Sequence, residues 1–301
     1  MPLSPDHIAR LRAATPGCTR VCHFNHAGGS LPSQGTPDAM SGQLQREAHS
    51  GPMEAAGAGA QLQEQARQTA ARVLNTCPQA IAFTSSGSAA WGMAFNALPA
   101  WQPGDRILVG RQEWAGNLAC MAPAVAAGAR LEVIPCDSHG AVSVPALESM
   151  LDSRVRLIAL TWLPANGGLI NPAAAIGQLA RQWRIPYFID AGQALGQVPC
   201  DVQALNCDVL KGAGRKYLRG PGQQSGLIAF TLEGWDGLAL KEELARRGIN
   251  IGANGVNYTP LDMQARGLGN IARIALSYFN TQEEIERLLQ ALEELAGNKR
   301  S

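Results

Sequence analysis

From Ile81 onward, short apolar runs alternate with stretches whose apolar residues recur at helical spacing. A short apolar run is typical of a buried strand, whereas apolar residues three and four positions apart are typical of one helix face. The runs predict strands at 81–84, 106–109, 131–135, 157–161, 187–190 and 209–210. The intervening stretches predict helices at 88–98, 117–127, 144–150, 172–183 and 202–205. This alternation predicts an α/β fold of three layers, with a mostly parallel sheet between helices.

The two ends of the chain have a different pattern. Residues 37–74 are predicted to be helical with an interruption at Gly51-Pro52, because proline breaks the backbone hydrogen-bond ladder of a helix. Near the C-terminus, Thr281 and Glu284 form a capping box that opens a final helix. Before it the pattern predicts a helix at 238–247 and strands at 249–251 and 272–278. We therefore expect a large domain over 1–230 and a small α+β domain over 231–301, with the polar N-terminal helix packed on the small domain.

Composition narrows the class of protein. Hydrophobic residues make up 46% of the 301 positions and charged residues 16%, as in ordinary globular proteins. The net charge of +1 gives no electrostatic footprint for nucleic acid or an anionic membrane, so neither partner is expected. No apolar run is long enough to span a bilayer, and the start lacks the apolar core of a secretory signal. The seven cysteines are odd in number and include no CxxC pair, which favours reduced thiols, no metal site and a cytoplasmic location.

Candidate chemistry is densest between Ile185 and Pro221. The apolar run at 187–189 ends on Asp190, and open α/β sheets bind ligands at the carboxyl ends of their strands. Lys216 stands between an arginine and a tyrosine, where a neighbouring cation and partial burial would lower its pKa and make its amine nucleophilic. An acid that can hold a pyridinium nitrogen and a lysine that can form an imine are the minimum for pyridoxal phosphate (PLP). A helix cap and a solvated lysine are the alternative interpretation.

A possible phosphate site follows the predicted strand at 81–84. Residues 83–91 read as a strand end, a turn of small residues and a helix start, where free N–H groups and the hydroxyls of Ser86 or Ser88 can bind a dianion. The same residues also fit ordinary helix capping.

Three further side chains are candidates on weaker grounds. Trp114 follows the strand at 106–109 and can lie on a cofactor ring, although a partly buried structural tryptophan fits as well. Asn166 lies in a glycine-rich turn, where asparagine often serves backbone conformation. Arg273 can bind both oxygens of a carboxylate, although a lone arginine on an edge strand is often only surface.

Along the chain, the candidates occur in the order phosphate turn at 83–91, Trp114, Asn166, Asp190-x-x-Gln193, Arg215-Lys216 and Arg273. This order resembles that of the class V aminotransferase family of fold-type I PLP enzymes. The family includes cysteine desulfurases, selenocysteine lyases and isopenicillin N epimerase-like proteins. The resemblance runs from Phe24 to Thr281, and its most specific motifs are Asp190-Ala-Gly-Gln193-Ala-Leu-Gly196 and Gly214-Arg-Lys216-Tyr-Leu-Arg-Gly-Pro221. The sequence is most similar to the epimerase-like and ergothioneine-type C–S lyase branch, which also carries Gly-Arg-Lys and a Tyr-x-Asn-Thr ending.

The resemblance implies a PLP-transferase fold and a role for each candidate. Lys216 would hold PLP as an imine (a Schiff base) and move the substrate α-proton. Asp190 would keep the pyridine nitrogen protonated, Gln193 would contact the phenolic oxygen, and Trp114 would stack on the ring. The remaining implied cofactor contacts are Gly87, Ser88, Asn166 and Arg215, and the implied substrate contacts are Asn25 and Arg273.

Three departures from the family pattern accompany the resemblance. Ala213 stands where the family has a phosphate-binding serine or threonine, and no cysteine lies in 248–257, which disfavours a desulfurase with a mobile catalytic cysteine. After Gly222 the chain passes almost directly into the small-domain pattern, which indicates an internal deletion of several dozen residues.

The expected function is a PLP-dependent enzyme acting on an amino acid, of C–S lyase or aminotransferase type, working as a homodimer. The alternatives are an amino-acid epimerase or racemase on the same scaffold, and a catalytically silent truncated paralogue that only dimerises.

Overall fold

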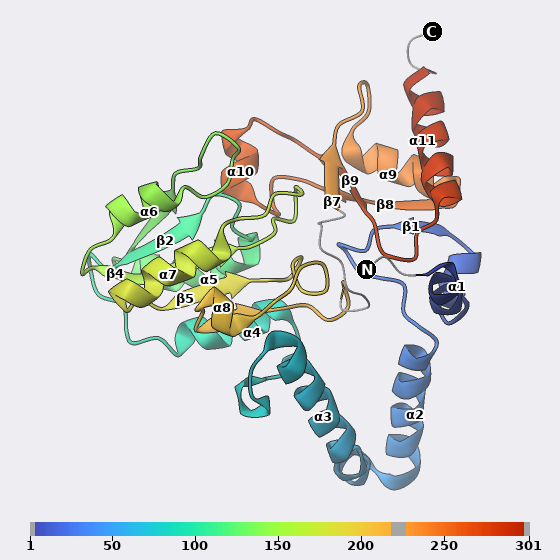
Figure 1. Ribbon diagram of the computed structural model, residues 1–301, viewed down its shortest axis with the longest axis horizontal. Helices are drawn as coiled ribbons and strands as arrows, with labels where there is room; N and C mark the ends of the chain where they lie inside the picture. The colour runs from blue at the N-terminus through green and yellow to red at the C-terminus, as the bar shows by residue number, and fades with distance from the viewer. Residues whose placement is uncertain (1–3, 218–226, 298–301) are drawn as a thin grey trace.

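The computed structural model describes residues 4–217 and 227–297, which are organised around two sheets (Figure 1). The larger sheet is wholly parallel, with strand order β3-β2-β4-β5-β6. Its strands are β2 (Arg106–Gly110), β3 (Arg130–Ile134), β4 (Val155–Thr161), β5 (Tyr187–Asp190) and β6 (Val209–Lys211). Thr161, Asp190 and Lys211 are register partners at the carboxyl ends of three adjacent strands. Three polar side chains therefore lie side by side at the carboxyl end of the sheet.

Helices cover both faces of this sheet, which confirms the predicted three-layer α/β architecture (Figure 1). The helices are α4 (Gly87–Asn96), α5 (Ala115–Ala126), α6 (Val144–Met150), α7 (Ala173–Trp183) and α8 (Val202–Leu205). Leu160 and Ile176 belong to the apolar cluster on one face, and Met121 and Phe188 belong to the cluster on the other. Each predicted helix of this region is present within a few residues of its expected bounds.

The predicted strand at 81–84 is wrong. The segment follows a short 3-10 helix, η2 (Pro78–Ala80), and the N–H of Ile81 donates to the Pro78 carbonyl at 3.0 Å. The Ile81 carbonyl accepts from Arg67 Nη1 at 3.1 Å. The N–H and C=O groups of Ile81 are thus hydrogen-bonded outside the sheet. The segment therefore does not pair with a neighbouring strand, although its residues are mostly apolar. Within the described residues, β6 is consequently an open edge strand.

The smaller sheet is mixed and joins distant parts of the chain. Its order is β1-β8-β9-β7, with β1 parallel to β8 and with β8 and β7 antiparallel to β9. Its strands are β1 (Cys22–Phe24), β7 (Leu227–Phe230), β8 (Ile249–Asn254) and β9 (Ile271–Ala275). The strand predicted over 272–278 thus ends at Ala275. The domain division at residue 230 stays a prediction, and the pairing of β7 with β9 favours a boundary before Leu227.

Helices α9 (Gly237–Arg246) and α11 (Gln282–Gly297) bury Leu240 and Leu288 in the core of this smaller sheet. The capping box is formed reciprocally, because Thr281 N donates to Glu284 Oε2 and Glu284 N donates to Thr281 Oγ1. Helix α1 (Pro5–Ala13) contacts this unit, as expected: Arg12 Nη2 donates to Glu284 Oε1 at 2.9 Å. The structure also has a short 3-10 helix η1 (Pro16–Thr19) and a helix α10 (Pro260–Ala265).

Helices α2 (Gly35–Ser50) and α3 (Pro52–Leu74) form a hairpin that extends away from both sheets (Figure 1). Their junction is the predicted break, where Gly51 has φ +92°. Only Ala55 and Ala71 of the hairpin are buried, whereas Met40, Leu44, Met53 and Leu62 are exposed. Among the described residues no helix is long and apolar enough to cross a bilayer.

Candidate active site

A cavity of about 260 Å³ lies at the carboxyl ends of β4, β5 and β6. Most of the cofactor-contacting residues predicted from the sequence line it: Gly87, Ser88, Trp114, Asp190, Gln193, Arg215 and Lys216. The remaining predicted residues, Asn25, Asn166 and Arg273, are not among its lining residues. The sequence motifs thus converge on one hollow from separate loops and helix starts.

Asp190 is the buried acid of this cavity. The Gly192 N–H donates to its Oδ1 at 2.9 Å, and Asn117 Nδ2 donates to its Oδ2 at 2.9 Å. Lys211 Nζ forms an ion pair with the same Oδ2, and both side chains are more than nine-tenths buried. Sequence reasoning missed Lys211, which directly follows the predicted strand at 209–210 and is brought beside Asp190 by the strand register.

Lys216 faces the same cavity as Asp190. A β-carbon built on Gly192 would lie 2.9 Å from Asp190 Oδ1 and 3.6 Å from Lys216 Nζ, so the two groups converge on one glycine. Burial lowers the pKa of Lys216 to about 8; the negative charge of Asp190 opposes this, and the nearby cations Lys211, Arg273 and Arg215 reinforce it. A lysine with this pKa is partly neutral near pH 7–8 and can act as a nucleophile or a base.

A second buried carboxyl group supports Asp190. Glu113 Oε1 accepts from Asn117 Nδ2 at 2.6 Å and from Thr161 Oγ1 at 3.0 Å, so the Asn117 amide bridges both acids. Complete burial raises the pKa of Glu113 to about 7, the Asp190 charge adds to the rise, and the hydrogen bonds oppose it. The sequence analysis missed Glu113, Asn117 and Thr161 as site residues, and their only signal was their place after predicted strands.

Helix α4 begins beside Lys211, and its first residues form part of the cavity wall. Ser86 caps the helix by accepting from Ala89 N at 3.1 Å, which leaves Ser88 and Gly87 on the cavity wall. A β-carbon on Gly87 would lie 2.8 Å from Lys211 Cε, so the lysine stem runs directly past the helix start. Ala213 also lines this wall and offers no hydroxyl group.

Trp114 and Arg215 occupy the rim of the cavity. The Trp114 ring lies 5.4 Å from the Tyr258 ring, measured between centroids, and is inclined to it by 59°. The Trp114 backbone N–H donates to Thr161 Oγ1 at 3.1 Å, which ties the loop to the end of β4. Arg215 is exposed, and its Nε donates to the Gly28 carbonyl at 3.3 Å.

The three predicted residues outside the lining are linked to it through Ala165 and Thr259, which do line the cavity. Arg273 Nη1 donates to the Ala165 carbonyl at 2.9 Å, and Nη2 donates to Asn25 Oδ1 at 3.4 Å. Asn166 Nδ2 donates to Thr259 Oγ1 at 2.8 Å. Arg273 is buried and its Nε has no hydrogen-bond partner, so it retains donor capacity next to the cavity wall.

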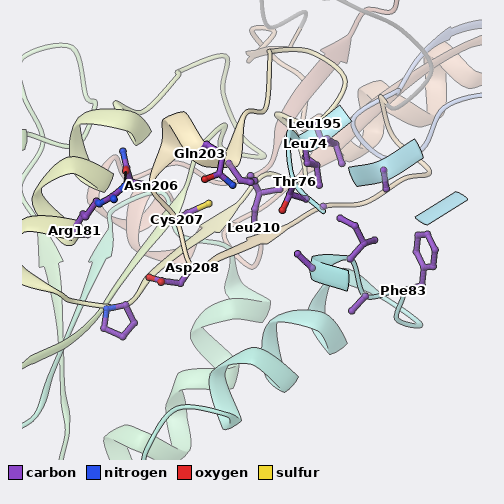
Figure 2. A pocket seen from close by; sticks show the side chains of 18 of the residues that line it. Leu74, Thr76, Phe83, Arg181, Leu195, Gln203, Asn206, Cys207, Asp208 and Leu210 are labelled. Atoms are coloured by element: carbon purple, nitrogen blue, oxygen red, sulfur yellow. Dashed lines mark hydrogen bonds between the residues drawn. The ribbon is translucent and has the colours of Figure 1, made fainter. Parts of the chain in front are cut away.

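A larger hollow of about 810 Å³ lies along the open edge of β6 (Figure 2). Three of its polar side chains have structural partners: Asp208 Oδ2 accepts from the Tyr187 N–H at 2.8 Å, and Arg181 Nη1 donates to Asn206 Oδ1 at 2.9 Å. Burial raises the pKa of Cys207 to about 11, so this thiol is protonated and unreactive at neutral pH. The described part of the chain holds no cluster of His, Cys, Asp and Glu side chains suited to a metal ion.

Comparisons with known proteins identify the family. Residues 24–222 match the model of the family "Aminotransferase class-V". The chain belongs to this family. A cysteine desulfurase of Dickeya dadantii is 35% identical over 123 residues, which are 40% of this chain and 30% of that protein. The matched part is therefore less than a third of the length of that relative.

Solved structures show the fold. Apo cysteine desulfurase from Thermococcus onnurineus superposes with a TM-score of 0.85 at 17% identity, covering 99% of this chain and 100% of that one. A C-DES variant with glycine covalently linked to its PLP cofactor gives a TM-score of 0.80 at 18% identity, covering 93% and 98% of the two chains. These similarities confirm the predicted PLP-transferase fold-type I.

The cofactor of the family is PLP, and the residues of the cavity fit it. An acid, a partly neutral lysine and a helix start surround a hollow, and these are the groups that PLP requires. Gln193 Nε2 donates to the Ala27 carbonyl at 3.1 Å, whereas its buried Oε1 has no hydrogen-bond partner. Buried polar atoms without a partner are rare in proteins, so Gln193 has capacity left for a group inside the cavity.

Proposed function

We propose that this chain is a PLP-dependent enzyme that acts on an amino acid, with chemistry of the C–S lyase or aminotransferase type. The observation that carries the proposal is the convergence of Asp190 and Lys216 on Gly192 within one cavity. Bound PLP supplies an electron sink that allows a proton to leave the α-carbon of an amino acid.

Lys216, rather than Lys211, binds the cofactor and moves the α-proton in this proposal. Lys211 is held in an ion pair with Asp190, so its amine is already engaged with another side chain. Within the described residues Lys216 makes no ion pair, and its pKa is lowered to about 8. Its neutral fraction rises as the pH passes through that value.

Asp190 would hold the pyridine nitrogen of PLP in its protonated form. The Gly192 N–H and the Asn117 amide fix both of its oxygens, so the carboxylate is oriented before a ligand arrives. Gln193 would contact the phenolic oxygen of PLP, and Trp114 would stack on its ring. Gly87, Ser88 and Arg215 would bind the phosphate group, and Asn166 would support the cavity wall through Thr259.

Arg273 binds the substrate carboxylate in this proposal, with Asn25 orienting it. Its buried guanidinium keeps an unpartnered Nε, which can donate to an incoming carboxylate. The names of the matched relatives, cysteine desulfurases, favour C–S bond cleavage over transamination.

We also infer the branch of the family to which the chain belongs. The Gly214-Arg-Lys216 motif and the Tyr278–Thr281 ending favour the epimerase-like and ergothioneine-type C–S lyase branch. An internal deletion after Gly222 stays a prediction, and the junction lies outside the described residues. The exposed Met40, Leu44, Met53 and Leu62 on the α2–α3 hairpin favour a homodimer. The cytoplasmic location stays a prediction.

The test is to add PLP to the purified chain and record its absorption spectrum. We expect a visible band from covalently held PLP that is absent in Lys216→Ala and that forms faster as the pH rises through about 8. Lys241→Ala, which changes an exposed lysine, is the matched control. A spectrum that is the same in the wild type and in Lys216→Ala would refute the assignment. Product analysis with amino acids then separates sulfur release, keto-acid formation and inverted stereochemistry.

A further inference from the structure

Lys211 is a buried charge in the cavity for which the proposed function has no use. Its side chain is 8% exposed, and it occupies one oxygen of the acid that the pyridine nitrogen requires. A buried charge is stable only while it is paired, so Lys211 needs another partner whenever Asp190 serves a ligand.

The second partner is indicated by the path of the lysine stem. Lys211 leaves the end of β6, passes the start of α4 near Gly87 with its Cε, and reaches Asp190 with its Nζ. Rotation about the side-chain bonds of a lysine moves its ammonium group without a change in the backbone. A group bound at Gly87 and Ser88 would therefore lie beside the stem of Lys211, within reach of its ammonium.

Among the described residues, the other side chains of this wall offer little buried positive charge for a phosphate. Ala213 has no hydroxyl group, and the Arg215 side chain is exposed and donates to the Gly28 carbonyl. Without Lys211, a phosphate dianion at the helix start would depend on backbone N–H groups, the Ser88 hydroxyl and the exposed Arg215.

We propose that Lys211 is the buried phosphate-binding cation of this site, beside the exposed Arg215, and that it exchanges its partner on ligand binding. In the free cavity its ammonium pairs with Asp190, and in the loaded cavity it pairs with the phosphate, which releases Asp190 for the pyridine nitrogen. The proposal rests on the proposed function for the identity of the ligand. It makes Lys211 the residue that distinguishes PLP from pyridoxal, because pyridoxal has no phosphate to draw the ammonium away from Asp190.

The first experiment measures dissociation constants for PLP and for pyridoxal in the wild type, in Lys211→Met and in the exposed control Lys241→Met. Methionine keeps most of the length of the lysine stem without its charge. We expect Lys211→Met to weaken PLP at least about tenfold and to leave pyridoxal equal or tighter, because a charge-assisted contact to phosphate is lost. PLP binding that is unchanged or tighter in Lys211→Met, or an equal loss for both ligands, would overturn the proposal.

The second experiment avoids PLP and uses inorganic phosphate on the free chain. It compares Asp190→Asn with Asp190→Asn/Lys211→Met, because the double variant leaves neither charge buried alone. Asp190→Asn releases Lys211, so it should bind phosphate at least about tenfold more tightly than the double variant, with a matching rise in melting temperature. Equal phosphate affinities in the two variants would refute the role of Lys211.

The two experiments separate the two proposals. Failure of the Lys216-dependent absorption band refutes the proposed function, and the phosphate comparison still decides the role of Lys211. Conversely, a normal band together with no difference between PLP and pyridoxal in Lys211→Met refutes only the exchange of partners.

Discussion

Of the two hollows beside β6, the larger one has few buried charged groups and the smaller one has a buried ion pair. The larger, of about 810 Å³, follows the edge of the sheet, and the smaller, of about 260 Å³, lies at its carboxyl end. The larger one is lined by exposed arginines and by polar groups with structural partners, whereas the smaller one contains the buried Asp190–Lys211 pair. In this molecule the volume of a hollow is therefore a poor guide to chemistry, and buried charge is a better one.

The difference follows from the geometry of parallel strands. Strand ends in register bring Thr161, Asp190 and Lys211 into one row, although they are far apart in the chain. The edge of β6 offers mainly backbone groups and the residues that happen to flank them. Charged side chains therefore concentrate at the end of a sheet, where adjacent chain segments stop together.

The largest expected difference between the two hollows is in stability. Asp190→Ala leaves Lys211 buried without its partner and should reduce the free energy of unfolding by about 3–5 kcal/mol. Arg181→Ala, which removes an exposed hydrogen bond at the larger hollow, should change it by about 0.5 kcal/mol or less. Urea denaturation near neutral pH measures both. Adding Lys211→Met to Asp190→Ala should restore part of the loss, and similar costs for the two single variants would remove the distinction between the hollows.

The next expected effect is a pH dependence between about pH 5 and pH 7.5 that comes from Glu113, the buried acid linked to Asp190 through Asn117. Burial raises the pKa of Glu113 from 4.5 to about 7, so the folded chain binds more protons than the unfolded chain between these values. Stability from this group is therefore full below about pH 4.5 and is lost as the pH rises toward 7. Relative to Glu113→Gln, the wild type should lose about 2 kcal/mol between about pH 5 and pH 7.5.

Glu113→Gln suits this comparison because its amide oxygen can still accept from Asn117 and Thr161. Urea denaturation at several pH values gives the two curves. Parallel curves for the two proteins would show that Glu113 titrates at an ordinary pKa.

The sequence was sufficient where structure depends on neighbours in the chain. The predicted helices at 144–150 and 202–205 match α6 and α8, because capping and helical spacing are local signals. Asp190 and Lys216 were found because each belongs to a short motif. The segment 81–84 was misjudged because apolar residues favour a strand, whereas strand formation also requires free backbone groups, and those of Ile81 are used by Pro78 and Arg67.

Long-range contacts account for what the sequence did not predict. Asn117 donates to Asp190 across 73 positions, and Thr161 donates to Glu113 across 48. Neither contact has a local signature, so the network behind Asp190 and the ion pair with Lys211 could not be read from spacing. The pairing of β1 with β8, which attaches the start of the chain to the smaller sheet, has no local signature either.

The smallest expected effect is a change in the free energy of unfolding caused by backbone conformation at the larger hollow. Arg184, on its wall, follows α7 with φ +56°, a left-handed conformation in which a β-carbon is unfavourable. Arg184→Gly relieves this strain but adds freedom to the unfolded chain, so we expect a net gain of about 0.5 kcal/mol. Arg181→Gly, the same substitution within the last turn of α7, should instead cost about 1 kcal/mol. Thermal denaturation distinguishes these opposite signs, and PLP affinity should be the same in both variants because neither residue lines the smaller cavity. A change in PLP affinity in either variant would mean that the two hollows are coupled through β6, and the contrast between them would then have to be abandoned.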